Sequence, residues 1–353
     1  MKNADFEGDV KMTDRSLSPA RRVTVIDVAR AAGVSAGTVS NAISGKRRVD
    51  DDTRKRIEQA INDLGYRPNL AARGMRTGRA NTIAIFSSMP MAVAAGSSRL
   101  GFLMEIAASA AVTALEFNTA LVLIPPIDDP ISALKSIAMD GVLVVEPEEN
   151  DPVLALMERM AIPTVTIGKP IGSASAYIDL DYHAVAEMLI DHLFEAGVRT
   201  FPLIIGASRR HSNLVFKEVY SCKAAQAGMQ QHIIEVPEAT AEAGAAAAVT
   251  QMLEAGRTFD AILVPIDAMA TGVMRVLRQH GLTVPDAVRV VTRYDGVRAR
   301  TEDPALTAVN LRLDEVATLA TRHLTKIIAG SVAQNRLAAP KPSLVIRGSS
   351  GRS

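Results

Sequence analysis

The chain has 353 residues, of which 48% are hydrophobic and 22% charged, and its formal net charge is +1. This length predicts two or three domains, and no apolar run is long enough to span a membrane. Residues 1–22 mix charges and lack the apolar centre of a signal peptide, so we expect a disordered N-terminal tail and a cytoplasmic protein. With a single cysteine, Cys222, the chain cannot form an internal disulfide.

Residues 24–45 (TVIDVARAAGVSAGTVSNAISG) predict two short helices that meet at a glycine. Thr24 is a good N-cap for the first helix, and Ala29 is small enough for a second helix to cross closely. Gly33 supplies the turn, Ser35 caps the second helix, and Val39 directs an apolar face back toward the first. This pattern is typical of a helix-turn-helix, which places its second helix in the DNA major groove. An ordinary helical hairpin is the alternative.

A third helix is predicted from Asp50, its N-cap, to about Leu64, with Gly65 as its stop. The helix-turn-helix domain would then span residues 23–66. The linker that follows, residues 67–80, contains alanines that permit a helix and glycines that weaken it. We therefore expect this linker to fold on binding.

Charge is unevenly distributed along the chain. Residues 15–79 contain fourteen Lys and Arg against six Asp and Glu, a net charge of +8, whereas residues 81–353 contain 23 against 28, a net charge of −5. A basic block over the predicted helix-turn-helix indicates a polyanionic partner and binding that weakens as salt rises.

Beyond Asn81, apolar strands alternate with helical segments. This alternation predicts a parallel α/β sheet, and the number of strands exceeds what one small sheet needs. One last strand is expected near Leu344–Arg347, within a C-terminal segment of residues 337–353. The predicted strands are TIAIF, TALVLI, GVLVV, PTVTIG, FPLIIG, AILVP and VRVVT.

Three segments carry a resemblance to a known family: residues 24–45, residues 49–69 (VDDDTRKRIEQAINDLGYRPN) and residues 71–85 (AARGMRTGRANTIAI). The chain resembles the LacI/GalR (lac repressor) family of bacterial transcription regulators. The resemblance implies an α/β protein with a three-helix helix-turn-helix headpiece, a hinge helix at 67–80, and a two-lobed, periplasmic-binding-protein-like effector domain at 81–336. It also implies that the chain crosses between the lobes near Ile178 and Val309.

The resemblance assigns DNA contacts residue by residue. Ala36, Gly37 and Asn41 fall at the family's base-reading positions, and of these Asn41 has the strongest hydrogen-bonding edge, suited to adenine. Met75 replaces the leucine that the family inserts into the minor groove, and Arg73 and Arg76 flank it. Expected contacts to the DNA backbone come from Thr24, Ser35, Thr38, Ser40, Arg47, Arg48, Tyr66 and Asn69.

The expected effector pocket departs from the family pattern. Phe216 aligns with the family's ligand-gripping arginine, and the family's aromatic stacking segment is replaced by small and apolar residues. We therefore expect an effector less polar than a free sugar, or none, unless Arg209 or Arg210 replaces the missing arginine. For Asp267, a role as helix cap is the alternative to a ligand contact. The expected lining is Met89, Met91, Phe102, Lys169, Asp179, Phe216, Ile266, Asp267, Tyr294 and Asp295.

These features predict a transcription regulator that binds specific DNA sequences and acts as a repressor. One headpiece reads few base pairs, so we expect a homodimer on a pseudo-palindromic operator, controlled by a small molecule of unknown identity. The apolar helix LMEIAASAAVTALEF is a candidate dimer interface. The sequence contains no phosphate loop, no zinc-spaced cluster and no nucleophile motif. We therefore expect no enzymatic activity, no metal and no cofactor. The alternative is an architectural DNA-binding protein that ignores effectors.

Overall fold

The computed structural model describes residues 23–44, 47–67, 78–94, 101–125, 127, 129–331 and 334–351. Contacts divide the chain into two units, residues 1–78 and 79–353. The predicted tail, 1–22, and most of the predicted hinge helix, including Asn69, Arg73, Met75 and Arg76, lie outside the described residues.

The first unit contains three helices, α1 (Val25–Ala32), α2 (Ala36–Ser44) and α3 (Asp51–Leu64). Thr24 and Asp27 form a reciprocal capping box at the start of α1, with Thr24 N donating to the Asp27 carboxylate at 2.9 Å. Gly33 ends α1 in the left-handed conformation, with a φ of 66°, which a residue with a side chain adopts at a cost. These caps fix the turn between α1 and α2.

Six buried residues hold the three helices together: Val28, Ala29, Ala32, Val39, Ile57 and Ala60. Val39 comes from α2, whereas the other five come from α1 and α3. The predicted roles of Ala29, Gly33 and Val39 in packing and turning are therefore confirmed, and the helix-turn-helix is present rather than an isolated hairpin.

The second unit begins with a first lobe, built on a parallel six-stranded sheet in the order β11-β5-β4-β3-β1-β2. Its strands are β1 (Thr82–Ser87), β2 (Ala120–Leu123), β3 (Gly141–Val145), β4 (Thr164–Ile167), β5 (Ala176–Asp179) and β11 (Arg336–Ala338). Its helices are α5 (Met91–Ala94), α6 (Phe102–Glu116), α7 (Pro130–Ser136), α8 (Pro152–Arg159) and α14 (Leu313–Ile328).

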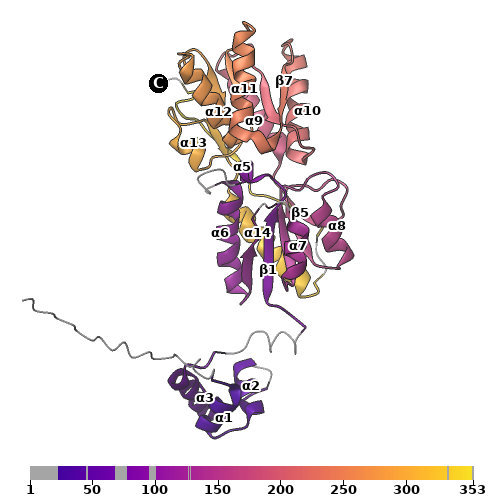
Figure 1. Cartoon of the computed structure of the whole chain (residues 1–353), viewed down its shortest axis with the longest axis vertical. Helices are drawn as coiled ribbons and strands as arrows, with labels where there is room; N and C mark the ends of the chain where they lie inside the picture. Colours follow the sequence, from indigo (N-terminus) through magenta and orange to yellow (C-terminus); the bar gives the residue numbers. More distant parts are fainter. Residues whose placement is uncertain are drawn as a thin grey trace, which may run out of the picture. The chain divides into compact units, whose positions relative to one another are not determined.

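Both faces of the first lobe's sheet are covered by helices. Neighbouring residues of a strand point to opposite faces, so each strand contributes side chains to both sides. Ile83 and Ile85 of β1 join the large core that includes residues of α6 and α14, while Ala84 and Phe86 join a second core with residues of α7 and α8. Helices therefore lie on either side of the sheet, as Figure 1 shows.

The second lobe is built on a parallel four-stranded sheet in the order β7-β6-β8-β9. Its strands are β6 (Leu203–Gly206), β7 (Ile233–Val236), β8 (Ala261–Leu263) and β9 (Arg289–Val291). Its helices are α9 (Tyr182–Glu195), α10 (His211–Gln226), η1 (Glu238–Thr240), α11 (Ala241–Glu254), α12 (Asp267–Gln279) and α13 (Val297–Thr301). A separate antiparallel pair joins β10 (Ala308–Asn310) to β12 (Ser343–Val345).

The chain passes between the lobes at three places. It leaves the first lobe between β5 and α9, returns between β10 and α14, and leaves again between β11 and β12. The first two passages lie close to the predicted crossings at Ile178 and Val309. The third brings the C-terminal strand, predicted near Leu344–Arg347, against β10. Strands β5, β7, β10 and β11 were not among the predicted ones, because they are short and each contains a polar residue that breaks the apolar pattern.

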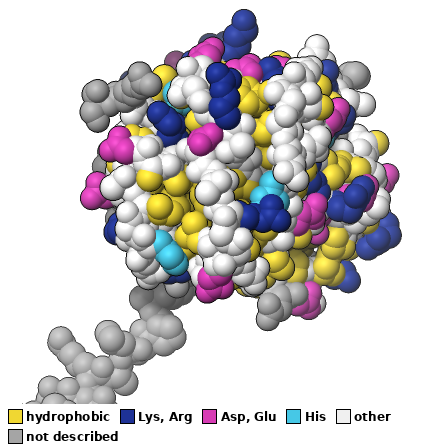
Figure 2. Space-filling model, turned by 90° about the horizontal axis from the view of Figure 1, so that it is seen from above, with side chains coloured by type: hydrophobic (Ala, Val, Ile, Leu, Met, Phe, Trp, Pro, Cys, Tyr) yellow, Lys and Arg dark blue, Asp and Glu magenta, His cyan; other side chains and the backbone are white. Residues whose placement is uncertain are grey.

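On the face of the second lobe shown in Figure 2, acidic, basic and apolar side chains are interspersed. This mixed surface contrasts with the basic block in the sequence of the headpiece. Within the described part of the chain, no helix combines the length and the apolar character needed to cross a membrane.

Candidate nucleic-acid interface and interlobe site

Helix α2 has an apolar side that is held in the headpiece and a polar side that faces away from it. Val39 is fully buried. Gly37 and Asn41, one helical turn apart, lie on the side opposite Val39, because each residue turns the helix by about 100°. Gly37 is exposed and Asn41 is half-buried. A base edge that approaches this side of α2 would meet Asn41 across the backbone of Gly37.

Ser35 fixes the start of α2. Its hydroxyl accepts from Thr38 N at 3.1 Å and lies 2.9 Å from the Thr38 hydroxyl. Both hydroxyls therefore lie at the N-terminal end of α2, where the helix dipole favours an anion such as a phosphate. Thr24 is in the same way committed to its capping box, and its hydroxyl donates to Asp27 at 2.7 Å.

The other predicted DNA contacts take different positions in the headpiece. Ala36 is half-buried and packs against the headpiece core, so its methyl group contributes to the packing of the headpiece. Arg47 and Arg48 are exposed, whereas Ser40 and Tyr66 are half-buried. The DNA contacts of these residues stay predictions.

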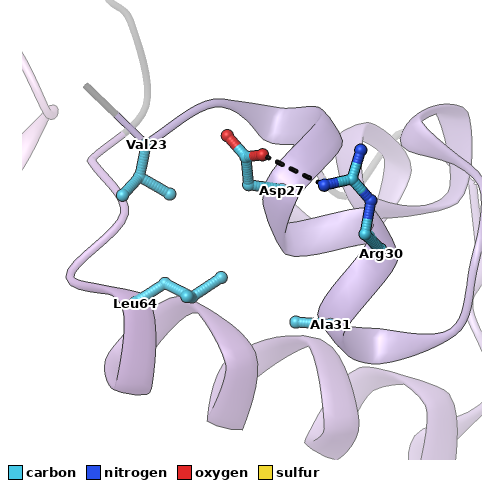
Figure 3. Close-up of a pocket in the computed structure, with 5 residues that line it drawn as sticks. All are labelled: Val23, Asp27, Arg30, Ala31 and Leu64. Carbon is cyan, nitrogen blue, oxygen red and sulfur yellow. Dashed lines mark ion pairs between the residues drawn. The ribbon is translucent and has the colours of Figure 1, made fainter. Parts of the chain in front are cut away.

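A pocket of the headpiece lies between α1 and the end of α3, lined by Val23, Asp27, Arg30, Ala31 and Leu64 (Figure 3). Arg30, which is exposed, and Asp27, which is half-buried, form an ion pair across 3.8 Å in this pocket. None of its lining residues belongs to α2. The pocket is therefore separate from the predicted base-reading residues.

In the effector domain, charged and polar side chains from both lobes meet at the ends of their strands. We call this group the interlobe site and define it by Glu146, Tyr182, Arg210, Glu238 and Arg293. Glu146 follows β3 of the first lobe, whereas the other four lie at the starts of α9, α10 and η1 and after β9 in the second lobe. Carboxyl ends of parallel strands are the usual ligand-binding edge of α/β sheets.

Every member of the interlobe site is buried, with an exposed fraction of 6% or less. Glu146 accepts from the Tyr182 hydroxyl at 2.6 Å, and Arg210 Nε donates to Glu238 at 3.1 Å. Burial, followed by the nearby Glu146 carboxylate, raises the pKa of Tyr182 well above its ordinary value, so this hydroxyl keeps its proton.

Arg293 differs from Arg210 in its partners. Its guanidinium lies 4.8 Å from the centre of the Tyr182 ring and its Nη1 lies 3.8 Å from Glu146 Oε2. Its Nε and Nη1 are buried without a hydrogen-bond partner among the described residues. A ring beneath a guanidinium and a nearby carboxylate balance the charge, but leave these two N–H groups available to an acceptor.

The predicted pocket residues differ in their burial and in their partners. Phe102 and Tyr294 are buried beside Arg293 and pack edge to face at 5.2 Å between ring centres. Phe216 lies in the hydrophobic core, and Asp179 and Asp295 are paired with arginines of the chain, Asp179 with Arg336 and Asp295 with Arg300 and Arg347. Lys169 and Met91 are exposed, and Met89 and Ile266 are buried.

Asp267 is the first residue of α12, and the N-cap itself is Ile266. The Asp267 carboxylate accepts from Ala268 N at 2.8 Å, so it satisfies an N–H of the first turn, in keeping with the structural alternative. Burial raises the pKa of Asp267, while Arg298 opposes the shift. The same carboxylate remains a candidate for a ligand contact.

One expectation from the sequence is wrong. The pocket was expected to have too few polar groups, yet Glu146, Ser212 and Glu238 are buried between the lobes in addition to Arg210 and Arg293. Of the two proposed replacements for the missing arginine, Arg210 lies in the site and Arg209 is exposed at its edge. Glu146 could have been found from its place in the sequence, because it directly follows the apolar strand GVLVV, at the strand end where α/β sheets bind ligands.

Comparisons with known proteins place both units. Residues 24–69 match the model of bacterial regulatory proteins of the lacI family, and residues 190–350 match that of a periplasmic binding protein-like domain. The HTH-type transcriptional regulator CelR of Thermobifida fusca is 29% identical over 297 residues, covering 82% of this chain and 87% of that protein. The ribose operon repressor of Escherichia coli K12 is 28% identical over 337 residues, covering 92% and 99%.

Solved structures give the same fold. A CelR–cellobiose complex matches with a TM-score of 0.68 and 26% identity, covering 93% of this chain and all of that one. The lac repressor dimer bound to operator and an anti-inducer matches with a TM-score of 0.77 and 22% identity, covering 94% and 99%. With a matching headpiece, a matching periplasmic binding protein-like domain and relatives aligned along most of its length, the chain is similar over both units to the lacI family of bacterial regulatory proteins.

Proposed function

We propose that this protein is a sequence-specific DNA-binding transcription regulator that represses genes by occupying a two-fold-symmetric operator as a homodimer. The observation that carries the proposal is the capped helix α2, with Val39 buried and Asn41 on the opposite side, in a headpiece whose sequence is basic. Its relatives are transcription regulators, which favours this function over catalysis and over an architectural role. Such a protein works on the chromosome in the cytoplasm.

The proposed dimer interface lies on α6 and α14, which pack side by side in the first lobe. Val112 and Leu115 of α6 are 66% and 68% exposed, and Leu319 of α14 is 37% exposed. A shallow groove between the helices is lined by Val112 and Leu319 with charged neighbours, including Glu116 and Arg322. Exposed apolar groups inside a polar rim suit an interface between two copies related by a two-fold axis.

A small-molecule effector between the lobes is part of the proposal. One relative was solved with cellobiose, and another is named for the ribose operon, so members of this family respond to small molecules. The idea of a less polar effector loses its premise, because the interlobe site is rich in charged groups. The buried N–H groups of Arg293 would suit an acceptor atom of the effector.

Selection from a random pool of double-stranded DNA by the purified full-length protein tests the DNA-binding part. We expect the recovered sequences to share two inverted half-sites at a fixed spacing, because a two-fold dimer presents two copies of α2. The same selection without protein is the control. Recovery of sequences without a shared motif would contradict sequence-specific binding.

A further inference from the structure

The interlobe site joins the two lobes through the chain's own side chains, and Glu146 is its centre on the first lobe. Glu146 Oε1 accepts from Tyr182 Oη and Glu146 Oε2 accepts from Ser212 Oγ, both at 2.6 Å. The same Oε2 lies 3.8 Å from Arg293 Nη1. All three partners belong to the second lobe, so one buried carboxylate makes polar contacts with three different segments across the junction.

Arg210 makes the reciprocal contacts from the second lobe. Its guanidinium is anchored in its own lobe by Glu238, and it donates across the junction to the carbonyl oxygens of Glu146 and Ser88 and to the Glu148 carboxylate. The distance is 3.0 Å to Ser88 O and 2.6 Å to Glu148 Oε1. Arg210 is 2% exposed, and its donors are therefore used inside the protein.

The backbone continues this connection. Glu149 N donates to Arg209 O at 3.1 Å, and Glu148 and Arg210 form an antiparallel β-bridge between the lobes. Helix α5 of the first lobe packs against η1, α11 and α12 of the second, and lies at the junction in Figure 1. Tyr294 also donates across the junction to Glu105.

Two glycines leave the space that the acidic groups occupy. A Cβ on Gly168 would lie 2.5 Å from Glu146 Oε1, and a Cβ on Gly206 would lie 2.4 Å from Glu238 Oε1. Glu146 itself has a φ of 51°, in the left-handed region that residues with side chains seldom adopt. Backbone strain of this kind persists where surrounding contacts hold it, which here are the contacts to the second lobe.

From these contacts we infer that Glu146 and Arg210 form an interlobe latch, which holds the two lobes closed without a bound molecule. The latch contacts are charge-assisted, and all except those of Arg210 to Ser88 and Glu148 are buried, so opening the lobes breaks several of them together rather than one at a time. A molecule that enters the junction has to compete with the latch. Its apparent affinity is its intrinsic affinity multiplied by the fraction of the protein that is open.

Closure can be measured as a distance between spin labels on the two lobes. The sole cysteine, Cys222 of α10, is exposed in the second lobe and takes one label. Lys135→Cys, at an exposed position on α7 of the first lobe, takes the other. Mixing labelled protein with excess unlabelled protein limits the signal to distances within one subunit. For the otherwise unchanged chain, we expect one narrow distance distribution with no effector added.

In the same labelled protein, Arg210→Met removes the contacts of the guanidinium, and we expect a second population at longer distances. Arg209→Met is the matched control, because Arg209 is the adjacent arginine and its side chain, 64% exposed, pairs with Glu149 at the surface. This control should keep the narrow distribution. Circular dichroism establishes that each variant is folded.

If Arg210→Met alone fails to fold, Arg210→Met combined with Glu238→Gln removes the buried carboxylate that would lose its partner and gives the same readout. A broad distribution in the unchanged chain, or a folded Arg210 variant with an unaltered distribution, would overturn the latch. The measurement uses neither DNA nor effector. Failure of the latch is therefore distinguishable from failure of the proposed function. Only the competition between the latch and an effector rests on that proposed function.

Discussion

At the scale of the residue, direct base readout depends on Asn41. Helix α2 carries no Lys or Arg, and Ala36 and Gly37 offer a methyl group and close approach rather than hydrogen bonds. We predict that Asn41→Ala relaxes the preference at one base pair in each half-site and costs about 1–3 kcal/mol of discrimination there. Binding profiles measured on a library of single-base variants of the selected operator would show the change.

Asn62→Ala is the matched control for this prediction, because Asn62 is an exposed asparagine near the end of α3. It should leave the profile unaltered at every position. If Asn41→Ala also leaves the profile unaltered, the assignment of base-reading positions along α2 is incorrect.

Residue roles were predictable from the sequence where they depend on local structure. Thr24, Gly33 and Ser35 act through neighbours within five residues, so their caps and turn follow from residue type and spacing. Glu146 and Arg210 act through each other across 64 positions, and no local pattern indicates that pairing. The loss of an arginine at Phe216 was visible, but its consequence depended on which other side chains the fold brings together.

At the scale of the element, α6 is predicted to carry the dimer contact. A charge in place of Leu115 would have to be buried against the partner without a matching group, which is unfavourable. We predict that Leu115→Glu raises the dimer dissociation constant by at least about tenfold, equivalent to about 1.4 kcal/mol. Sedimentation velocity over a range of protein concentrations measures this shift.

Met160→Glu is the control, because Met160 is an apolar residue of the same lobe that is 45% exposed at the end of α8. It should leave the dissociation constant unchanged. Equal effects of the two substitutions would place the interface elsewhere or show that added charge acts on the fold.

Strands and helices differ in how well the sequence predicts them. The buried strands β1, β3, β4 and β6 consist of apolar residues with only Thr, Ser or Gly besides, and all were predicted. In contrast, β11 reaches the first lobe from near the C-terminus and pairs with β5, which places residues about 160 positions apart side by side. Strands β10 and β11 have three residues each, with an amide or a charged side chain among them, and carry too little pattern to be recognised alone.

At the scale of the whole molecule, the headpiece and the effector domain have different charge. The basic block in residues 15–79 should provide affinity for any DNA through phosphate contacts, and this part of the binding falls as salt rises. Specific recognition requires in addition that two headpieces engage two half-sites at once. We therefore expect the preference for a specific sequence to depend on the pairing of subunits, whereas the affinity for any DNA depends on the basic residues of each headpiece.

The most direct test of this account is the affinity of the full-length protein for its selected operator, relative to a random duplex of equal length, at physiological salt. We predict that the operator is bound at least about a thousandfold more tightly, and that scrambling one half-site removes most of this preference. A ratio close to one, with both duplexes weakened equally by salt, would contradict the claim that the protein is a sequence-specific regulator.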